Sequence, residues 1–235
     1  AFASTSDQLH AYGAYLFFQY LTRIKGTSPA VIRYIWEATE AGDAFKALDA
    51  GLKKGGAPLD ESWPAFGVHA WNTSQPFAKY MEKDILPLRA AVQDTFPMSV
   101  AGGQGFFELA KGDEIKLPRL STRYFAFEFP DDTSAVVGFF NGLNFSVRLQ
   151  TVEEWGEAFS AQLPGATPKG AHVRALLKIG GTWKEEDWTG RRFVTFCRQK
   201  DSEKLESLVV ILSNASVDTS NDLMAGLKDR KPRLK

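Results

Sequence analysis

The chain has 235 residues, 44% of them hydrophobic and 24% charged, which is the balance of a folded globular protein and excludes extensive disorder. Its 28 basic residues equal its 28 acidic ones, which excludes the strong positive field of a nucleic-acid or acidic-membrane binder. No apolar run approaches the ~18 residues needed to span a bilayer.

The N-terminal third has helical periodicity. Residues 7–25 predict an amphipathic helix with an apolar stripe in steps of three and four, made of Leu9, Tyr12, Leu16, Tyr20 and Ile24. Ser28 and Pro29 supply a cap and a first-turn proline for a second helix. The expected buried face of this second helix consists of Val31, Ile32, Ile35 and Trp36.

Two more helices are expected before residue 72. One begins near Asp43 and stops at Gly55 and Gly56, and the other covers residues 61–71. Their expected inward residues are Phe45, Leu48 and Leu52 in the first helix and Trp63, Phe66 and Trp71 in the second. Glycines at positions 102, 103 and 105 then indicate a linker. We therefore expect a helical domain over residues 1–104.

Residues 105–235 have the period of two that is typical of strands. Phe125, Phe127 and Phe129 alternate with Tyr124, Ala126 and Glu128, so the phenylalanines are expected to face a core. About seven strands are predicted: 106–109, 121–129, 135–140, 144–150, 172–179, 192–198 and 205–212. The predicted fold class is α+β, with the helical domain followed by an antiparallel β-sandwich, Ig-like or jelly-roll-like.

The sequence contains no recognisable catalytic motif. The histidines, His10, His69 and His172, are far apart, and none begins the His-Glu-x-x-His pattern of a zinc hydrolase. No Gly-x-Ser-x-Gly elbow occurs, and the single cysteine, Cys197, lies among strand residues where a buried core role is expected. We therefore assign no catalytic, metal or cofactor residue, although a hydrolase with a dispersed site stays an alternative.

Binding residues are the remaining candidates. Trp155, Trp183 and Trp188 lie near turns of the β-rich part, where exposed rings could stack on a polysaccharide. Adjacent acidic residues at 131–132, 153–154 and 185–187 read as solvated loop charge, with a loop-bound calcium ion as the alternative. Asn72, Asn144 and Asn214 each open an Asn-x-Ser/Thr tripeptide, which matters only in a secreted eukaryotic protein.

Two stretches carry a family resemblance. Residues 12–21, 31–36 and 47–50 resemble the helical region behind the active site of secreted gluzincin-type zinc metallopeptidases. Residues 117–124 and 210–216 are similar to the β-rich C-terminal domains of such proteins, whereas their zinc-binding helix has no counterpart here. The resemblance implies a non-catalytic C-terminal portion of an exported peptidase-like protein, secreted, periplasmic or at the cell surface. Its implied partner is an upstream catalytic domain; the alternative function is a carbohydrate-binding or surface-adhesion module.

Overall fold

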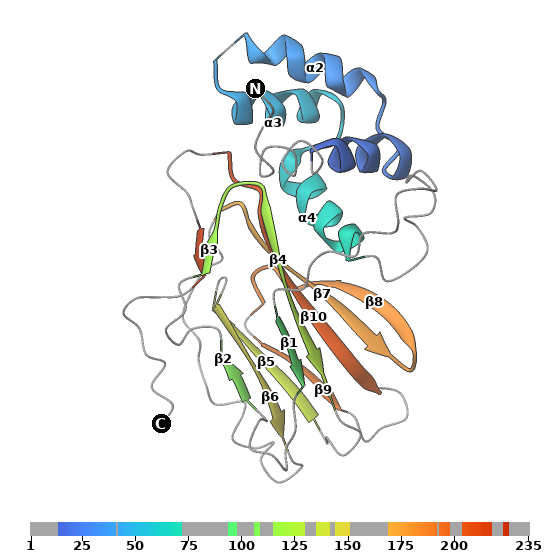
Figure 1. Ribbon diagram of the computed structural model, residues 1–235, viewed down its shortest axis with the longest axis vertical. Coiled ribbons are helices and arrows are strands. Elements are labelled where there is room, and N and C mark those ends of the chain that lie inside the picture. Colours follow the sequence, from blue (N-terminus) through green and yellow to red (C-terminus); the bar gives the residue numbers. More distant parts are fainter. Residues whose placement is uncertain are drawn as a thin grey trace, which may run out of the picture. The chain divides into compact units, whose positions relative to one another are not determined.

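The computed structural model shows a helical unit and a β-rich unit (Figure 1). It describes residues 14–40, 42–71, 94–97, 106–108, 115–129, 135–141, 144–150, 169–191, 193–197, 204–217 and 223–225. The first unit comprises Ala1–Ala90 and Val217–Thr219, and the second comprises Ala91–Ser216 and Ser220–Lys235. The predicted α+β class is therefore confirmed. The boundary between the two units falls after Ala90, whereas the sequence analysis placed it near residue 104.

The described helices follow the sequence signals closely, and residues 7–13 of the first expected helix, with Leu9 and Tyr12, lie outside the described residues. Residues 14–19 are α-helical and continue into a π-helical turn, η1 (Tyr20–Ile24). The three helices after it are α2 (Ala30–Thr39), α3 (Ala44–Lys54) and α4 (Leu59–Ala70). Asp43 caps α3 as expected, because its Oδ1 accepts hydrogen bonds from the backbone N–H groups of Phe45 and Lys46 at 3.0 and 3.1 Å. In the described part of the chain, no helix combines the length and apolarity that a membrane span requires.

Helices α2 and α3 pack closely because α3 presents glycine at the contact. A Cβ atom on Gly51 would lie 2.5 Å from the backbone of Ile35, and one on Gly55 would lie 2.7 Å from a methyl group of Val31. The buried side of α2 is therefore centred on Val31, which is fully buried. The expectation that Ile32 and Trp36 are also buried is wrong, since they are 41% and 70% exposed.

The strands form three sheets. Their bounds are β1 (Asp94–Pro97), β2 (Phe106–Glu108), β3 (Ile115–Leu117), β4 (Ser121–Glu128), β5 (Ala135–Asn141), β6 (Asn144–Gln150), β7 (Ala171–Ile179), β8 (Thr182–Asp187), β9 (Phe193–Cys197), β10 (Leu205–Asn214) and β11 (Leu223–Ala225). The order is β1-β4-β10-β7-β8 in a five-stranded sheet, β2-β6-β5-β9 in a four-stranded sheet, and β11-β3 in a two-stranded one. The large sheet is open, and its β1–β4 pair is parallel, which corrects the expectation of purely antiparallel pairing.

The register confirms the predicted alternation in β4. Phe125, Phe127 and Phe129 belong to one buried cluster, whereas Glu128 is exposed. The other members of the cluster come from both large sheets and their flanks: Leu117, Val136, Val147, Ala171, Val173, Ala175, Leu177, Trp188, Val194, Leu205, Leu208, Val210 and Leu212. The opposite face of β4 holds Tyr124, which is also buried. The phenylalanines thus lie in the main apolar core.

All seven expected strands are present, and four further strands are not predicted by alternation. β1, β3 and β11 have three or four residues each, too few to establish a period of two. β8 is longer, but four of its six residues are charged, so it lacks an apolar face in the sequence. These strands form because a neighbouring strand supplies their backbone partners.

The β4 register predicts how two neighbouring substitutions differ. Phe127→Ala removes a fully buried ring and should lower the free energy of unfolding by about 3–5 kcal/mol. Glu128→Ala changes an exposed side chain and should cost well under about 1 kcal/mol. Urea denaturation followed by the fluorescence of buried Trp188 measures both. A larger loss for Glu128→Ala would contradict the register.

The α2–α3 contact predicts a result opposite to helix propensity. Alanine normally stabilises a helix by up to about 1 kcal/mol relative to glycine. Gly51→Ala should nevertheless destabilise the helical unit by about 1–3 kcal/mol, because the methyl group would collide with the Ile35 backbone. Ala50→Gly, at an exposed site of the same helix, is the control and should cost about 0.5–1 kcal/mol. Thermal unfolding by circular dichroism compares them; a stabilised Gly51→Ala variant would show that the helices are further apart.

Candidate functional site

Polar side chains gather on the face of the large sheet opposite the main core, where β7 meets β8. The register places Tyr124, Ile211, Arg174 and Asp187 in one row across β4, β10, β7 and β8. Tyr124 and Ile211 are buried, and burial raises the pKa of the Tyr124 phenol above its usual range. Arg174 therefore extends from an apolar strip toward the charged edge strand.

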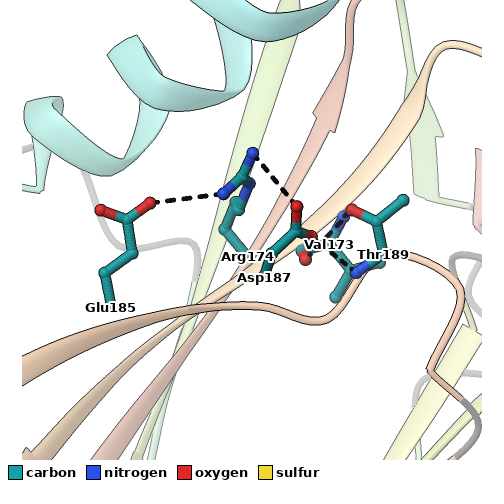
Figure 2. Close-up of polar contacts among 5 residues, drawn as sticks. All are labelled: Val173, Arg174, Glu185, Asp187 and Thr189. Atoms are coloured by element: carbon teal, nitrogen blue, oxygen red, sulfur yellow. Dashed lines mark hydrogen bonds and ion pairs between the residues drawn. The ribbon is translucent and has the colours of Figure 1, made fainter.

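Arg174 joins the two strands through ion pairs. Its Nη1 lies 3.6 Å from Oε1 of Glu185, and its Nη2 lies 3.2 Å from Oδ2 of Asp187. Figure 2 shows the guanidinium between these two carboxylates. The Arg174 side chain is 22% exposed, whereas both carboxylates are about half exposed, and its Nε has no hydrogen-bond partner in the described part of the structure. The arrangement holds a mostly buried cation against two partly solvated anions.

Asp187 is also held by the turn that follows β8. Its Oδ1 accepts a hydrogen bond from the backbone N–H of Thr189 at 2.9 Å. Partial burial alone would raise the pKa of Asp187, but hydrogen bonds from Thr189 and the charges of Arg174 and His172 lower it overall. Thr189 in turn contacts β7, since its Oγ1 accepts a hydrogen bond from the backbone N–H of Val173 at 3.1 Å (Figure 2). The carboxylate is thus ionised and fixed.

A second ion pair lies at the other end of β7. The pairing of β7 with β10 shifts between Leu205 and Ser207, which leaves Glu206 as the extra residue of a bulge. Glu206 places Oε2 2.9 Å from Nζ of Lys178, and its Oε1 accepts a hydrogen bond from the Gly181 N–H at 2.7 Å. The bulge therefore directs a carboxylate to the β7–β8 turn.

The two described candidate tryptophans, Trp183 and Trp188, do not share an exposed surface. Trp188 is fully buried, lies 6.1 Å from the ring of Phe196, and donates its indole N–H to Oε2 of Glu186 at 2.8 Å. It is a core residue and offers no exposed ring for stacking on a sugar, which corrects its assignment as a ligand-binding candidate. Trp183 lies partly buried on β8, and Trp155 lies outside the described residues.

The histidines occupy different parts of the fold. His69 belongs to α4, where burial lowers its pKa and its ring lies 5.3 Å from that of Tyr20. His172 belongs to β7, and His10 lies outside the described residues. Among the residues that the structure describes, no three metal-ligating side chains converge. Cys197 ends β9 opposite Ala135, and its burial stays a prediction.

Asn214 has a structural role that rules out its use as a glycan acceptor in the folded chain. It is fully buried, and its Nδ2 donates a hydrogen bond to the carbonyl of Leu117 at 2.9 Å. Its Oδ1 accepts a hydrogen bond from the N–H of Ser216, also at 2.9 Å. Leu120, which has a left-handed φ of 52°, donates its N–H to the Asn214 carbonyl. One asparagine thus ties the chain before β4 to the end of β10.

Sequence reasoning placed the acidic residues 185–187 in a loop and missed their pairing. The sequence contains a signal for this pairing. Basic residues at 174 and 178 interrupt the apolar run of β7, and because they are four positions apart they lie on one face of the strand. Basic residues on one face of a buried strand require anionic partners, and an acidic neighbouring strand supplies them. Chemically, the assembled groups brace the sheet edge, because each acidic residue of β8 already faces a cation or an N–H donor.

The lowered pKa of Asp187 predicts a pH-dependent contribution to stability. A carboxylate with a depressed folded-state pKa stabilises the fold above its unfolded value and loses that effect as the pH falls through the folded pKa. Asp187→Asn should therefore cost about 1 kcal/mol near neutral pH, and the difference from the wild type should close in acid below the ordinary carboxyl pKa. Urea midpoints across this pH range measure it. Glu185→Gln, which alters the longer ion pair, is the control; a pH-independent Asp187→Asn effect would contradict the assignment.

Comparisons with known proteins give no relative from which a role could be transferred. The chain matches no family model, no curated protein and no solved structure. The resemblance of residues 12–21 and 117–124 to gluzincin-type peptidases therefore stays an expectation, and the chemistry of the site rests on its geometry.

Proposed function

We propose that this chain is a non-catalytic C-terminal portion of an exported peptidase-like protein, and that its β-rich part serves binding or stability. The observation that supports the non-catalytic role is the bracing of β8 by Arg174, Asp187 and Thr189. A catalytic carboxylate must be available to a substrate, whereas Asp187 is engaged on one side by a guanidinium and on the other by a turn. The cluster supports the sheet edge.

We further infer that the two large sheets form a β-sandwich, with Ig-like or jelly-roll-like connections. Support comes from the main core cluster, to which β4, β7 and β10 of one sheet and β5, β6 and β9 of the other contribute side chains. Sheets that share one apolar layer in this way pack face to face. Such a unit is suited to a supporting or binding role because its loops and edges can vary without loss of the core.

The coding sequence and an activity assay test the proposed function. We expect the open reading frame to continue upstream into a secretory signal and a His-Glu-x-x-His helix, because this chain carries the post-catalytic resemblance without that motif. The purified chain should not hydrolyse casein with or without added zinc. Hydrolysis that is abolished by His172→Ala would contradict the proposal, and so would a complete reading frame that lacks any zinc motif.

A further inference from the structure

A row of side chains crosses the face of the large sheet opposite the main core, close to the β7–β8 turn. Strand pairing places one residue from each of β4, β10, β7 and β8 in this row: Glu128, Ser207, Lys178 and Trp183. We call it the Trp183 row. Directly paired residues on one face of a sheet have Cβ atoms about 5 Å apart, so the row extends for roughly 15 Å.

The Trp183 row is accessible to solvent, unlike the row beside it. In that neighbouring row, Leu176 and Val209 are buried. In the Trp183 row, Glu128 is exposed, the Lys178 side chain is 39% exposed, and the other two residues are partly exposed. A molecule in solution can therefore reach all four side chains.

Three polar groups of the Trp183 row are not used by the fold. In the described part of the structure, the Glu128 carboxylate, the Ser207 hydroxyl and the Trp183 indole N–H make no hydrogen bond or ion pair. The fourth residue, Lys178, is held by Glu206, whose Oε2 lies 2.9 Å from its Nζ. An ammonium group has three N–H donors, so Lys178 keeps donors for a further partner. The row thus offers donors and acceptors beside one aromatic ring.

This combination of groups matches the chemistry of a sugar. A pyranose ring has an apolar C–H face, which can pack on an indole ring, and hydroxyl groups at its edge, which donate and accept hydrogen bonds. Trp183 supplies the ring, and the rest of the row supplies a carboxylate, a hydroxyl and an ammonium group. A purely apolar ligand would cover these polar groups without pairing them, which is unfavourable.

The charges near the Trp183 row disfavour an anionic ligand. Lys178 is the cation of the row and is paired with Glu206, whereas Glu128 adds a second carboxylate without a basic partner in the described structure. One cation against two carboxylates leaves a local negative charge, which repels a phosphate or a sugar acid. The row therefore favours an uncharged sugar.

We propose that the Trp183 row binds a neutral oligosaccharide, with one pyranose ring stacked on Trp183. The sugar chain lies across β8, β7, β10 and β4, and its hydroxyl groups bond to Lys178, Ser207 and Glu128. This inference rests on the binding role in the proposed function and names its class of ligand.

Nuclear magnetic resonance of the whole chain, labelled with nitrogen-15, locates the site. The probes are cellohexaose, xylohexaose, mannohexaose and chitohexaose, each added to millimolar concentration. At least one should shift the indole N–H signal of Trp183, which is assigned by its loss in Trp183→Phe. The signal of buried Trp188 should stay in place. No shift with any probe, equal shifts of both signals, or a Trp183 shift produced only by an acidic galacturonic acid oligomer would overturn the proposal.

Calorimetric titration of variants with the responding probe separates recognition from folding. Trp183→Ala should weaken binding by about tenfold or more, because the stacking surface is lost, whereas Trp183→Phe keeps a ring and should stay within about threefold. Glu128→Ala should leave the stability nearly unchanged and still weaken binding by about threefold or more. Trp36→Ala, which removes an exposed tryptophan from α2, is the matched control and should bind like the wild type.

Two results of the titration would refute the site: undiminished affinity of Trp183→Ala, or an equal loss in Trp36→Ala. The sugar site and the proposed function fail separately. Loss of sugar binding leaves the absence of hydrolysis untouched, and a reading frame without a zinc motif leaves the titrations untouched.

Discussion

The structure of the β-rich unit depends on the burial of β10 between β4 and β7. Every residue from Leu208 to Asn214 is buried, and β4 and β7 supply hydrogen-bonded partners on its two sides. A strand buried on both faces must be apolar at successive positions, which explains the run of five aliphatic residues that begins at Leu208. Its alternate residues face the main core and the Tyr124–Arg174 row. The two faces of the sheet are thus coupled through one strand.

The ends of β10 fix the register of that strand. At its start, the bulge at Glu206 sets the residue count against β7 and supplies an anion to Lys178. At its end, Asn214 binds the backbone of Leu117 and Leu120. A slip of one residue would exchange the side chains of the two faces and would also break both anchors. Polar residues at the two ends of β10 therefore fix one register for a strand whose centre is uniformly apolar.

Electrostatics distinguishes the two long sheet edges. At β8 the charges are paired within the chain, with Arg174 and Arg191 opposing three acidic residues. Because the charges on β8 are largely neutralised by these partners, they disfavour pairing with another strand without producing a strong electrostatic field around the protein. At β9 the strand itself is uncharged, and the charge lies in the flanking sequence. The charges of β8 are thus balanced within the chain.

The sequence by itself determined the elements whose periodicity is long and regular. The alternation of phenylalanines at 125, 127 and 129 was sufficient to predict which face of β4 is buried. Asp43 was sufficient to predict where α3 begins. Both signals act over a few residues and depend little on distant parts of the chain.

Only the tertiary structure decided features that depend on a neighbour. β8 is a strand because β7 pairs with it, although its own residues are mostly charged. Trp36 is 70% exposed although α3 packs closely against the neighbouring Ile35 at Gly51. Trp188 is fully buried as part of the main core. The pairing of Arg174 with Asp187 likewise arises from strand register, which joins residues distant in sequence. Composition and local period describe what a segment prefers, whereas burial and charge pairing are set by what packs against it.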